Sequence, residues 1–294
     1  MAEMHGNEPV KPGEKDETVQ TKEELLAALQ RDFATSVNKV YANSVGREFS
    51  FSEITVQDQK SLTRMMQANK NRKDIVYDAQ CALINKAALD PDFDVYQLSD
   101  FDRTKIMIAL YQENVFQNDV KFVCEECGET NAYKMDFGAT LRKLDDYVLE
   151  KKTFEYENRR FKYSFDLEYP SVRTVSRFHQ SYCARHGNVP KKQQAADATM
   201  TNLEYINLFI KSVKVVNKET GAERAINLED YKISDREDIL AAFPQDALYA
   251  EGGVLKYVVS QYIKPVNDCF DRHECLNCGA VHEKEGSDQV QGFF

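Results

Sequence analysis

The sequence lacks the features that mark several large classes of protein. Its 294 residues include no apolar run long enough to cross a bilayer, and no signal peptide stands at the N-terminus. Gly-rich phosphate loops, an H-E-x-x-H motif and a Ser/His/Asp arrangement are also missing. We therefore expect a soluble protein without a membrane span, in a reducing cytosol, that is not an enzyme.

Basic residues are fewer than acidic residues. The chain has 38 Lys and Arg against 48 Asp and Glu, which gives a formal net charge of -10 at pH 7. A general nucleic-acid binder needs clustered cations that replace the counterions of the phosphates. The composition therefore argues against nucleic acid as a partner. The length suffices for one large or two modest domains, each with a real core.

Four of the seven cysteines form two copies of a CxxCG motif. The first copy contains Cys124 and Cys127, the second contains Cys275 and Cys278, and a glycine follows each copy directly. Two intervening residues let one tight turn aim both thiolates at one ion, and the glycine permits a positive φ. Four thiolates suit zinc better than a hard cation and leave no position for a water. We predict that these cysteines share one structural Zn²⁺.

The residues around both motifs favour a zinc-ribbon module. Apolar and polar residues alternate on either side of the first motif, as in a strand, a turn and a second strand, and the second motif has similar flanks. Nearly half of the chain separates the two motifs. The entropic cost of closing a loop grows only logarithmically with its length, so a folded insertion between them is tolerable.

Other residues near the motifs offer alternative ligands. His273 and His282 flank the second motif and could replace a cysteine, and Cys269 precedes it by six positions. We prefer the four thiolates because they already complete a tetrahedral shell.

The remaining cysteine patterns give little support to a redox or nucleophilic role. A redox role for a CxxC pair requires a thioredoxin-like βαβ pattern, which is not visible. Cys81 stands alone on an apolar helical stretch, where a free thiol behaves as a small buried hydrophobe. Cys183 and His186 stand three apart on an expected helix, a spacing more typical of packing than of a Cys/His nucleophile.

The periodicity predicts an α+β fold that is mostly helical, with the zinc-ribbon-like hairpins closed by the two motifs. Helices are expected over 22–33, 55–66, 73–88, 99–114, 171–186, 202–213, 235–243 and 246–263. Three residue pairs read as helix caps, namely Thr55 with Asp58, Ser99 with Asp102 and Ser234 with Glu237. A short strand is expected over 46–54, a hairpin over 154–169, and either a short helix or a connection over 141–147.

We divide the chain into four parts. Residues 1–21 are polar and should form a disordered tail, and residues 22–118 form a helical domain. Residues 119–140 combine with 264–285 to make the zinc ribbon. Residues 141–263 are the inserted α+β region.

The order of parts over residues 45–180 carries a family resemblance. A helix that begins with an Asp-Arg step leads into a hydrophobic strand, a CxxCG motif and a strand that ends near an aspartate. The residues in those roles are Asp102, Arg103, Cys124, Cys127 and Asp136. This order resembles the T4-type bacteriophage baseplate hub subunit family.

The resemblance implies a non-enzymatic structural or assembly component of the hub of a contractile-tail baseplate. It implies other phage tail and baseplate hub proteins as partners and leaves a homo-oligomer open. The location it implies is the host cytoplasm during assembly and the tail baseplate of the virion.

A second interpretation is a zinc-ribbon nucleic-acid adaptor of viral transcription or replication. A local basic patch could be made by Arg159, Arg160 and Lys162, or by Arg173 with Arg177. A cluster of this size is more often a solvated face. Salt-sensitive binding to DNA or RNA would favour the adaptor, whereas co-purification with tail proteins would favour the hub.

Overall fold

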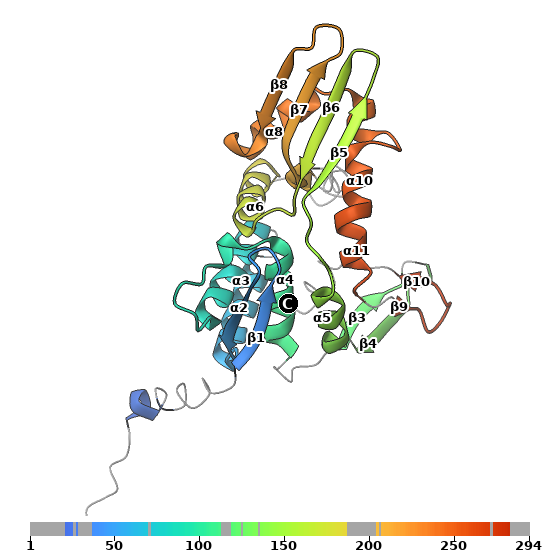
Figure 1. Cartoon of the computed structure of the whole chain (residues 1–294). Coiled ribbons are helices and arrows are strands. Elements are labelled where there is room, and N and C mark those ends of the chain that lie inside the picture. The colour runs from blue at the N-terminus through green and yellow to red at the C-terminus, as the bar shows by residue number, and fades with distance from the viewer. Residues whose placement is uncertain are drawn as a thin grey trace, which may run out of the picture. The chain divides into compact units, whose positions relative to one another are not determined.

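Figure 1 shows the computed structural model of the chain. It describes residues 21–25, 28, 37–69, 72–112, 119–124, 126–134, 136–186, 204–205, 207–270 and 273–282. The chain divides into a first unit, Met1–Ser36, and a second, Val37–Phe294. In the first unit, residues 22–25 and 28 are helical; the predicted tail up to residue 20 and the rest of the helix over 22–33 lie outside the described residues.

The second unit begins with a hairpin and three helices. Strand β1 (Val37–Ala42) pairs antiparallel with β2 (Arg47–Ser52), and helices α2 (Val56–Ala68), α3 (Lys73–Ala87) and α4 (Asp100–Gln112) follow. The predicted cap of α2 is confirmed, because Thr55 and Asp58 form a reciprocal capping box. Helix α6 (Val172–His186) packs on α3 and completes the first hydrophobic core with β1 and β2. Strand β1 was not predicted.

The start of α4 is tied to the β1–β2 turn by a buried carboxylate. The predicted cap is present, since the backbone N–H of Asp102 donates to the Ser99 hydroxyl at 3.1 Å. The carboxylate of Asp102 is fully buried and accepts the backbone N–H groups of Asn43 at 2.7 Å and of Ser44 at 3.0 Å. One turn later, the buried Lys105 donates to the carbonyl of Tyr41 at 2.7 Å.

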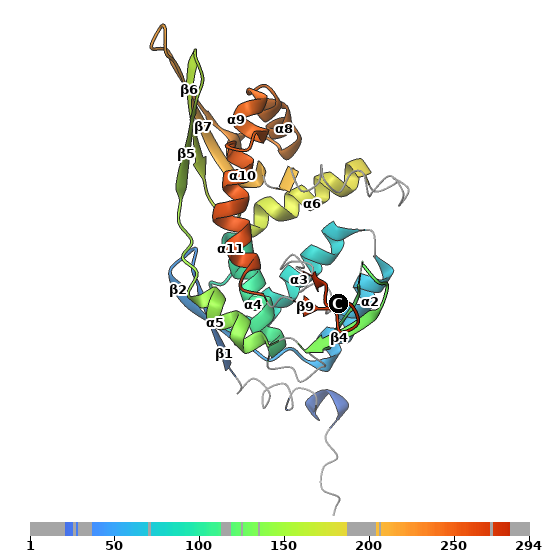
Figure 2. The same cartoon turned by 90° about the vertical axis from the view of Figure 1, so that its right-hand side faces the viewer.

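A four-stranded antiparallel sheet forms the largest β-structure among the described residues. Its order is β5 (Lys152–Glu157), β6 (Phe161–Leu167), β7 (Ile210–Asn217) and β8 (Glu223–Asn227). The predicted hairpin over 154–169 supplies its first two strands. Helices α8 (Ile233–Ala241), α9 (Gln245–Tyr249) and α10 (Val254–Val258) lie on one side of it (Figure 2) and share its apolar core.

The helix predicted over 202–213 is wrong in its C-terminal part. A 3-10 turn, η2 (Asn207–Phe209), leads directly into strand β7, of which Val213 is a fully buried member. Four of the eight residues of β7 are Ile or Val, and β-branched side chains lose rotamer freedom in a helix but pack well on a sheet. The turn into β8 uses Gly221 at a φ of 70°.

The predicted cap of α8 is also wrong. The helix begins two residues earlier than expected, at Ile233, after Lys232, which makes no side-chain cap bond. The Ser234 hydroxyl instead donates to the carboxylate of Asp235 at 3.0 Å. The N-cap residue of α8 therefore supplies no side-chain acceptor to the first turn of the helix.

The single helix predicted over 246–263 is interrupted. A Cβ on Gly253 would lie 2.6 Å from the carbonyl oxygen of Leu248, so the tight turn between α9 and α10 requires glycine. The helical path then continues through a π-helical turn, η4 (Val259–Ile263), into α11 (Lys264–Asn267). A third apolar cluster joins α11 to α4 and to α5 (Phe137–Asp145), the short helix left open over 141–147.

The predicted α+β class is confirmed. The fold is less helical than expected, because only about half of the described residues are helical. None of the helices in the described ranges combines the length and the apolarity that a membrane crossing needs.

The buried carboxylate of Asp102 generates the first prediction. Replacing Asp102 by Ala removes a buried carboxylate and leaves the backbone N–H groups of Asn43 and Ser44 without their acceptor, which should lower the free energy of unfolding by about 2–4 kcal/mol. Denaturant unfolding followed by circular dichroism measures the change. The exposed Asp238 of α8 is the control, and its replacement by Ala should change the stability by less than about 0.5 kcal/mol. Equal effects of the two substitutions would refute the anchoring role.

Candidate metal centre

The first CxxCG motif forms the tip of a β-hairpin. Strands β3 (Asp119–Val123) and β4 (Thr130–Lys134) pair antiparallel on either side of it. The backbone N–H of Cys124 donates to the carbonyl of Glu129 at 2.8 Å, and that of Gly128 donates to the carbonyl of Cys124 at 2.8 Å. Gly128 has a φ of 73°, as the motif predicted.

The second motif repeats this backbone. Strands β9 (His273–Glu274) and β10 (Val281–His282) pair antiparallel. The N–H of Cys275 donates to the carbonyl of Ala280 at 2.8 Å, that of Gly279 donates to the carbonyl of Cys275 at 2.8 Å, and the φ of Gly279 is again 73°. Both hairpins expected from the sequence are therefore present, and their turns share the same hydrogen bonds.

The structure brings the four thiols of the two motifs together. The Sγ atoms of Cys124 and Cys278 are 3.6 Å apart, as are those of Cys127 and Cys275, and all four sulfur atoms lie within 4.8 Å of one another. None of them is in a disulfide. Four thiolates around an ion at about 2.3 Å would have their sulfur atoms about 3.8 Å apart. The observed spacing fits one shared ion.

The donor set restricts which ion could be held. Within the described residues, these cysteines form the one cluster of three or more Cys, His, Asp or Glu side chains close enough to share a metal. Four sulfur donors suit zinc and other thiophilic metals and are poor ligands for Mg²⁺ or Ca²⁺. Cys124 and Cys275 are buried, while Cys127 and Cys278 are exposed, so a metal could enter from the solvent side.

A buried asparagine of the first hairpin orients the second hairpin. The side-chain amide of Asn131 donates to the sulfur of Cys275 at 3.4 Å, and its oxygen accepts the N–H of Leu276 at 2.9 Å. The same amide group donates to the carbonyl of Glu129 at 3.1 Å. Asn131 thus connects both turns and one ligand, as residues behind metal ligands commonly do. The sequence analysis did not identify it.

The electrostatics around the thiols favour a bound cation. The backbone N–H of Cys278, with that of Asn277 and the Asn131 amide, lowers the pKa of Cys275 to about 6 against the opposing effect of desolvation. The N–H of Ala280 lowers the pKa of Cys278, but desolvation and the neighbouring thiols outweigh it and raise that pKa to about 12. Without a cation, neighbouring thiols therefore resist deprotonation together, and a metal ion removes this repulsion.

Of the three alternative ligands, the structure describes the side chain of Cys269 alone. Cys269 lies in the third apolar cluster, where its thiol donates to the carbonyl of Pro265 at 3.3 Å, and it is not part of the thiol cluster. His273 and His282 are opposite each other in the β9–β10 pair, but their side chains lie outside the described residues.

The remaining cysteines are buried. Cys81 is fully buried in the first core, and burial raises the pKa of its thiol to about 12, as expected for a packing residue. Burial also raises the pKa of Cys183, beside Asp74. A raised pKa reduces the thiolate fraction, which is unfavourable for a nucleophile. The side chain of His186, the other member of that candidate pair, lies outside the described residues.

The position of Asn131 generates a second prediction. Replacing Asn131 by Ala removes the amide that orients Cys275 and the second turn, so metal affinity should fall by about 10- to 100-fold while four sulfur ligands remain. Competition with a chromophoric chelator measures the affinity. The neighbouring exposed Thr130 provides the control, and its replacement by Ala should leave the affinity unchanged. Equal affinities of the two variants would contradict this role of Asn131.

The comparisons with known proteins identify a family. The profile of the family described as T4 bacteriophage base plate protein matches residues 34–249. The matched region includes the first cysteine motif and ends before the second. No curated protein and no solved structure matches the chain. Because the family profile covers well over half of its residues, this chain belongs to the T4 bacteriophage base plate protein family.

Proposed function

We propose that this base plate protein is a structural or assembly component of the baseplate hub, and that one Zn²⁺ bound by its four clustered cysteines fixes its shape. The observation that carries the proposal is the family match over residues 34–249. The order of parts over residues 45–180 supports the hub as the specific place within the baseplate.

The zinc acts as a cross-link between distant parts of the chain. The sulfur pairs join residues 154 and 148 positions apart, and the four-stranded sheet with its helices lies between them in sequence. We therefore treat residues 119–140 and 264–285 as one zinc-ribbon module and residues 141–263 as an insertion into it. The ion would use Cys124, Cys127, Cys275 and Cys278, which leaves no position for a substrate or a catalytic water.

The protein acts through its surfaces in this proposal. Its partners are other tail and baseplate hub proteins, and its place is the host cytoplasm during assembly and the tail baseplate in the virion. The raised pKa of Cys183 argues against this thiol as a nucleophile, because a protonated buried thiol reacts poorly.

Two of the five basic residues that suggested a nucleic-acid adaptor are paired with acids. Lys162 pairs with Glu155 at 3.0 Å, and Arg173 lies 3.8 Å from Asp94. Paired cations present less net charge to a phosphate backbone. The family match supports a base plate protein, so we do not advance the adaptor as a second function.

The metal generates a third prediction. Protein purified anaerobically without chelator should contain about one zinc per chain, because four thiolates complete one tetrahedral site. Replacing Cys124 or Cys278 by Ser should remove the zinc and much of the tertiary stability, since metal affinity contributes directly to folding. Elemental analysis and thermal unfolding measure the two effects. Replacing Cys269 by Ser is the control, because this thiol lies outside the cluster. Metal-free wild-type protein would refute the zinc site.

The place in the hub generates a fourth prediction. Loss of the protein should abolish tail assembly and leave heads and genome replication intact. In an amber mutant, complementation with a Cys183→Ser variant should restore tails, because Cys183 has only a packing role, whereas Cys124→Ser should resemble loss of the protein. Tails counted by electron microscopy separate these outcomes. Normal tails without the protein would overturn the hub assignment, and a defect in late transcription or replication would indicate the adaptor.

A further inference from the structure

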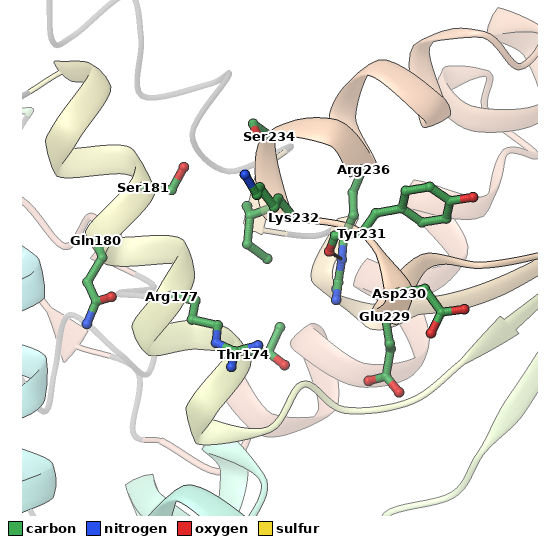
Figure 3. Close-up of a pocket in the computed structure, with 11 residues that line it drawn as sticks. Thr174, Arg177, Gln180, Ser181, Glu229, Asp230, Tyr231, Lys232, Ser234 and Arg236 are labelled. Carbon is green, nitrogen blue, oxygen red and sulfur yellow. Dashed lines mark hydrogen bonds between the residues drawn. The ribbon is translucent and has the colours of Figure 1, made fainter.

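A polar pocket lies between α6 and the segment that joins β8 to α8. Its volume is about 510 Å³. Thr174, Arg177 and Ser181 line it from successive turns of one face of α6, and the opposite wall includes Lys232 and Arg236 (Figure 3). The pocket is separate from the cysteine cluster and shares no residue with it.

One wall of the pocket contains a buried guanidinium with unused donors. Arg236 is 7% exposed, and its Nε donates to the carbonyl of Tyr231 at 3.3 Å. Its Nη1 is buried and has no hydrogen-bond partner among the residues that the structure describes. In Figure 3 the side chain extends from α8 into the space that faces Arg177. A guanidinium has five N–H donors and keeps its charge at neutral pH, so burying it without an acceptor is unfavourable.

Two further features of the pocket favour an anion. Arg177 is exposed on α6 and extends into the same space, and the described residues offer it no ion pair. Helix α8 begins at Ile233 with no side-chain cap, and both Ile233 and Ser234 line the pocket. Uncapped N–H groups at a helix N-terminus stabilise a negative charge.

The acidic residues of the pocket limit which anion fits. The Glu229 carboxylate accepts from Lys211 at 2.7 Å, and that of Asp230 accepts from Asn227 at 3.1 Å. These two carboxylates would repel a polyanion or a doubly charged phosphate more than a singly charged group. Tyr231, which is 45% exposed, adds an aromatic surface of the kind that protein interfaces use.

We propose that this pocket binds a carboxylate of a partner polypeptide, held by Arg236 and Arg177 at the N-terminus of α8. Tyr231 packs against the residues next to the bound carboxylate. If the proposed function holds, the partner is another baseplate protein. The carboxylate site itself does not depend on the proposed function.

Nuclear magnetic resonance of the full chain tests the site directly. The probe is a blocked tripeptide, acetyl-Gly-Glu-Gly-amide, titrated at constant ionic strength, with the Gln tripeptide and inorganic phosphate as comparisons. We expect the Glu tripeptide to give saturable shifts of the arginine Nε–Hε signals of Arg236 and Arg177, and the Gln tripeptide to give none. Phosphate binding as tight as that of the Glu tripeptide would overturn the carboxylate assignment, and no saturable shift with the Glu tripeptide would overturn the site.

Variants separate binding from folding. Arg177→Ala and Arg236→Met should each weaken binding of the Glu tripeptide by about tenfold or more. Arg173→Ala is the control, because Arg173 is exposed one turn earlier on α6 and does not line the pocket. The melting temperature of Arg236→Met should equal or exceed that of the wild type, since the substitution removes a buried guanidinium whose Nη1 has no hydrogen-bond partner among the described residues. A lower melting temperature would show that Arg236 is structural and would overturn its binding role, as would an equal loss of binding in Arg173→Ala.

Discussion

The convergence of four thiols from two hairpins is the constraint on which the path of the chain depends. The closest sulfur atoms are 3.6 Å apart although they belong to residues 148 and 154 positions apart in sequence. Four such thiols cannot all ionise at this distance without a cation, because like charges in contact repel strongly. A bound metal turns this repulsion into a cross-link, and for structural zinc the binding free energy is about 10–16 kcal/mol. Such a cross-link far outweighs the additional entropy of closing a long loop.

Apolar contacts hold the segment before the second hairpin close to the segment after the first hairpin. After the sheet, the chain runs through α10, η4 and α11, and Phe270 then packs with Phe101 of α4 and Phe137 of α5. Phe137 follows the first hairpin closely, and Phe270 precedes the second one by a few residues. The third apolar cluster therefore brings both hairpins to the same side of α4, where Asn131 and the thiols complete the contact.

A second set of buried polar contacts fixes α4 to its neighbours. The buried Asp100 accepts the hydroxyl of Tyr77 at 2.6 Å, the Nε of Arg103 at 2.7 Å and the hydroxyl of Tyr205 at 3.2 Å. Burial alone would raise the pKa of this carboxyl, but Arg103 and the Tyr77 hydroxyl outweigh burial and lower it. Charged groups buried in this way are stable only when every partner is in place, so this network specifies how α3, α4 and the segment before β7 fit together.

The sequence predicted the features that depend on local chemistry. The two cysteine turns, the Thr55 and Ser99 caps and the hairpin over 154–169 all follow from residues a few positions apart, and all are present. The α+β class and the base plate family were likewise anticipated, while the zinc and the hub remain predictions.

Features that depend on distant partners escaped prediction. The first half of β7, residues 210–213, falls within a predicted helix because its pairing with β6 and β8, rather than its own periodicity, decides its structure. Asn131 gained its role only when the second hairpin came within reach of the first. The pocket beside Arg236 likewise exists only because α6 and α8, far apart in sequence, lie next to each other.

Zinc K-edge X-ray absorption of the purified, metal-loaded protein is the most direct measurement of the central claim, because it reports the atoms that surround the ion. Our account predicts a first shell of four sulfur atoms at about 2.3 Å and no nitrogen or oxygen ligand. A shell that contains imidazole nitrogen, or only two sulfur atoms, would contradict the account. Such a result would mean that the two cysteine motifs do not share one ion.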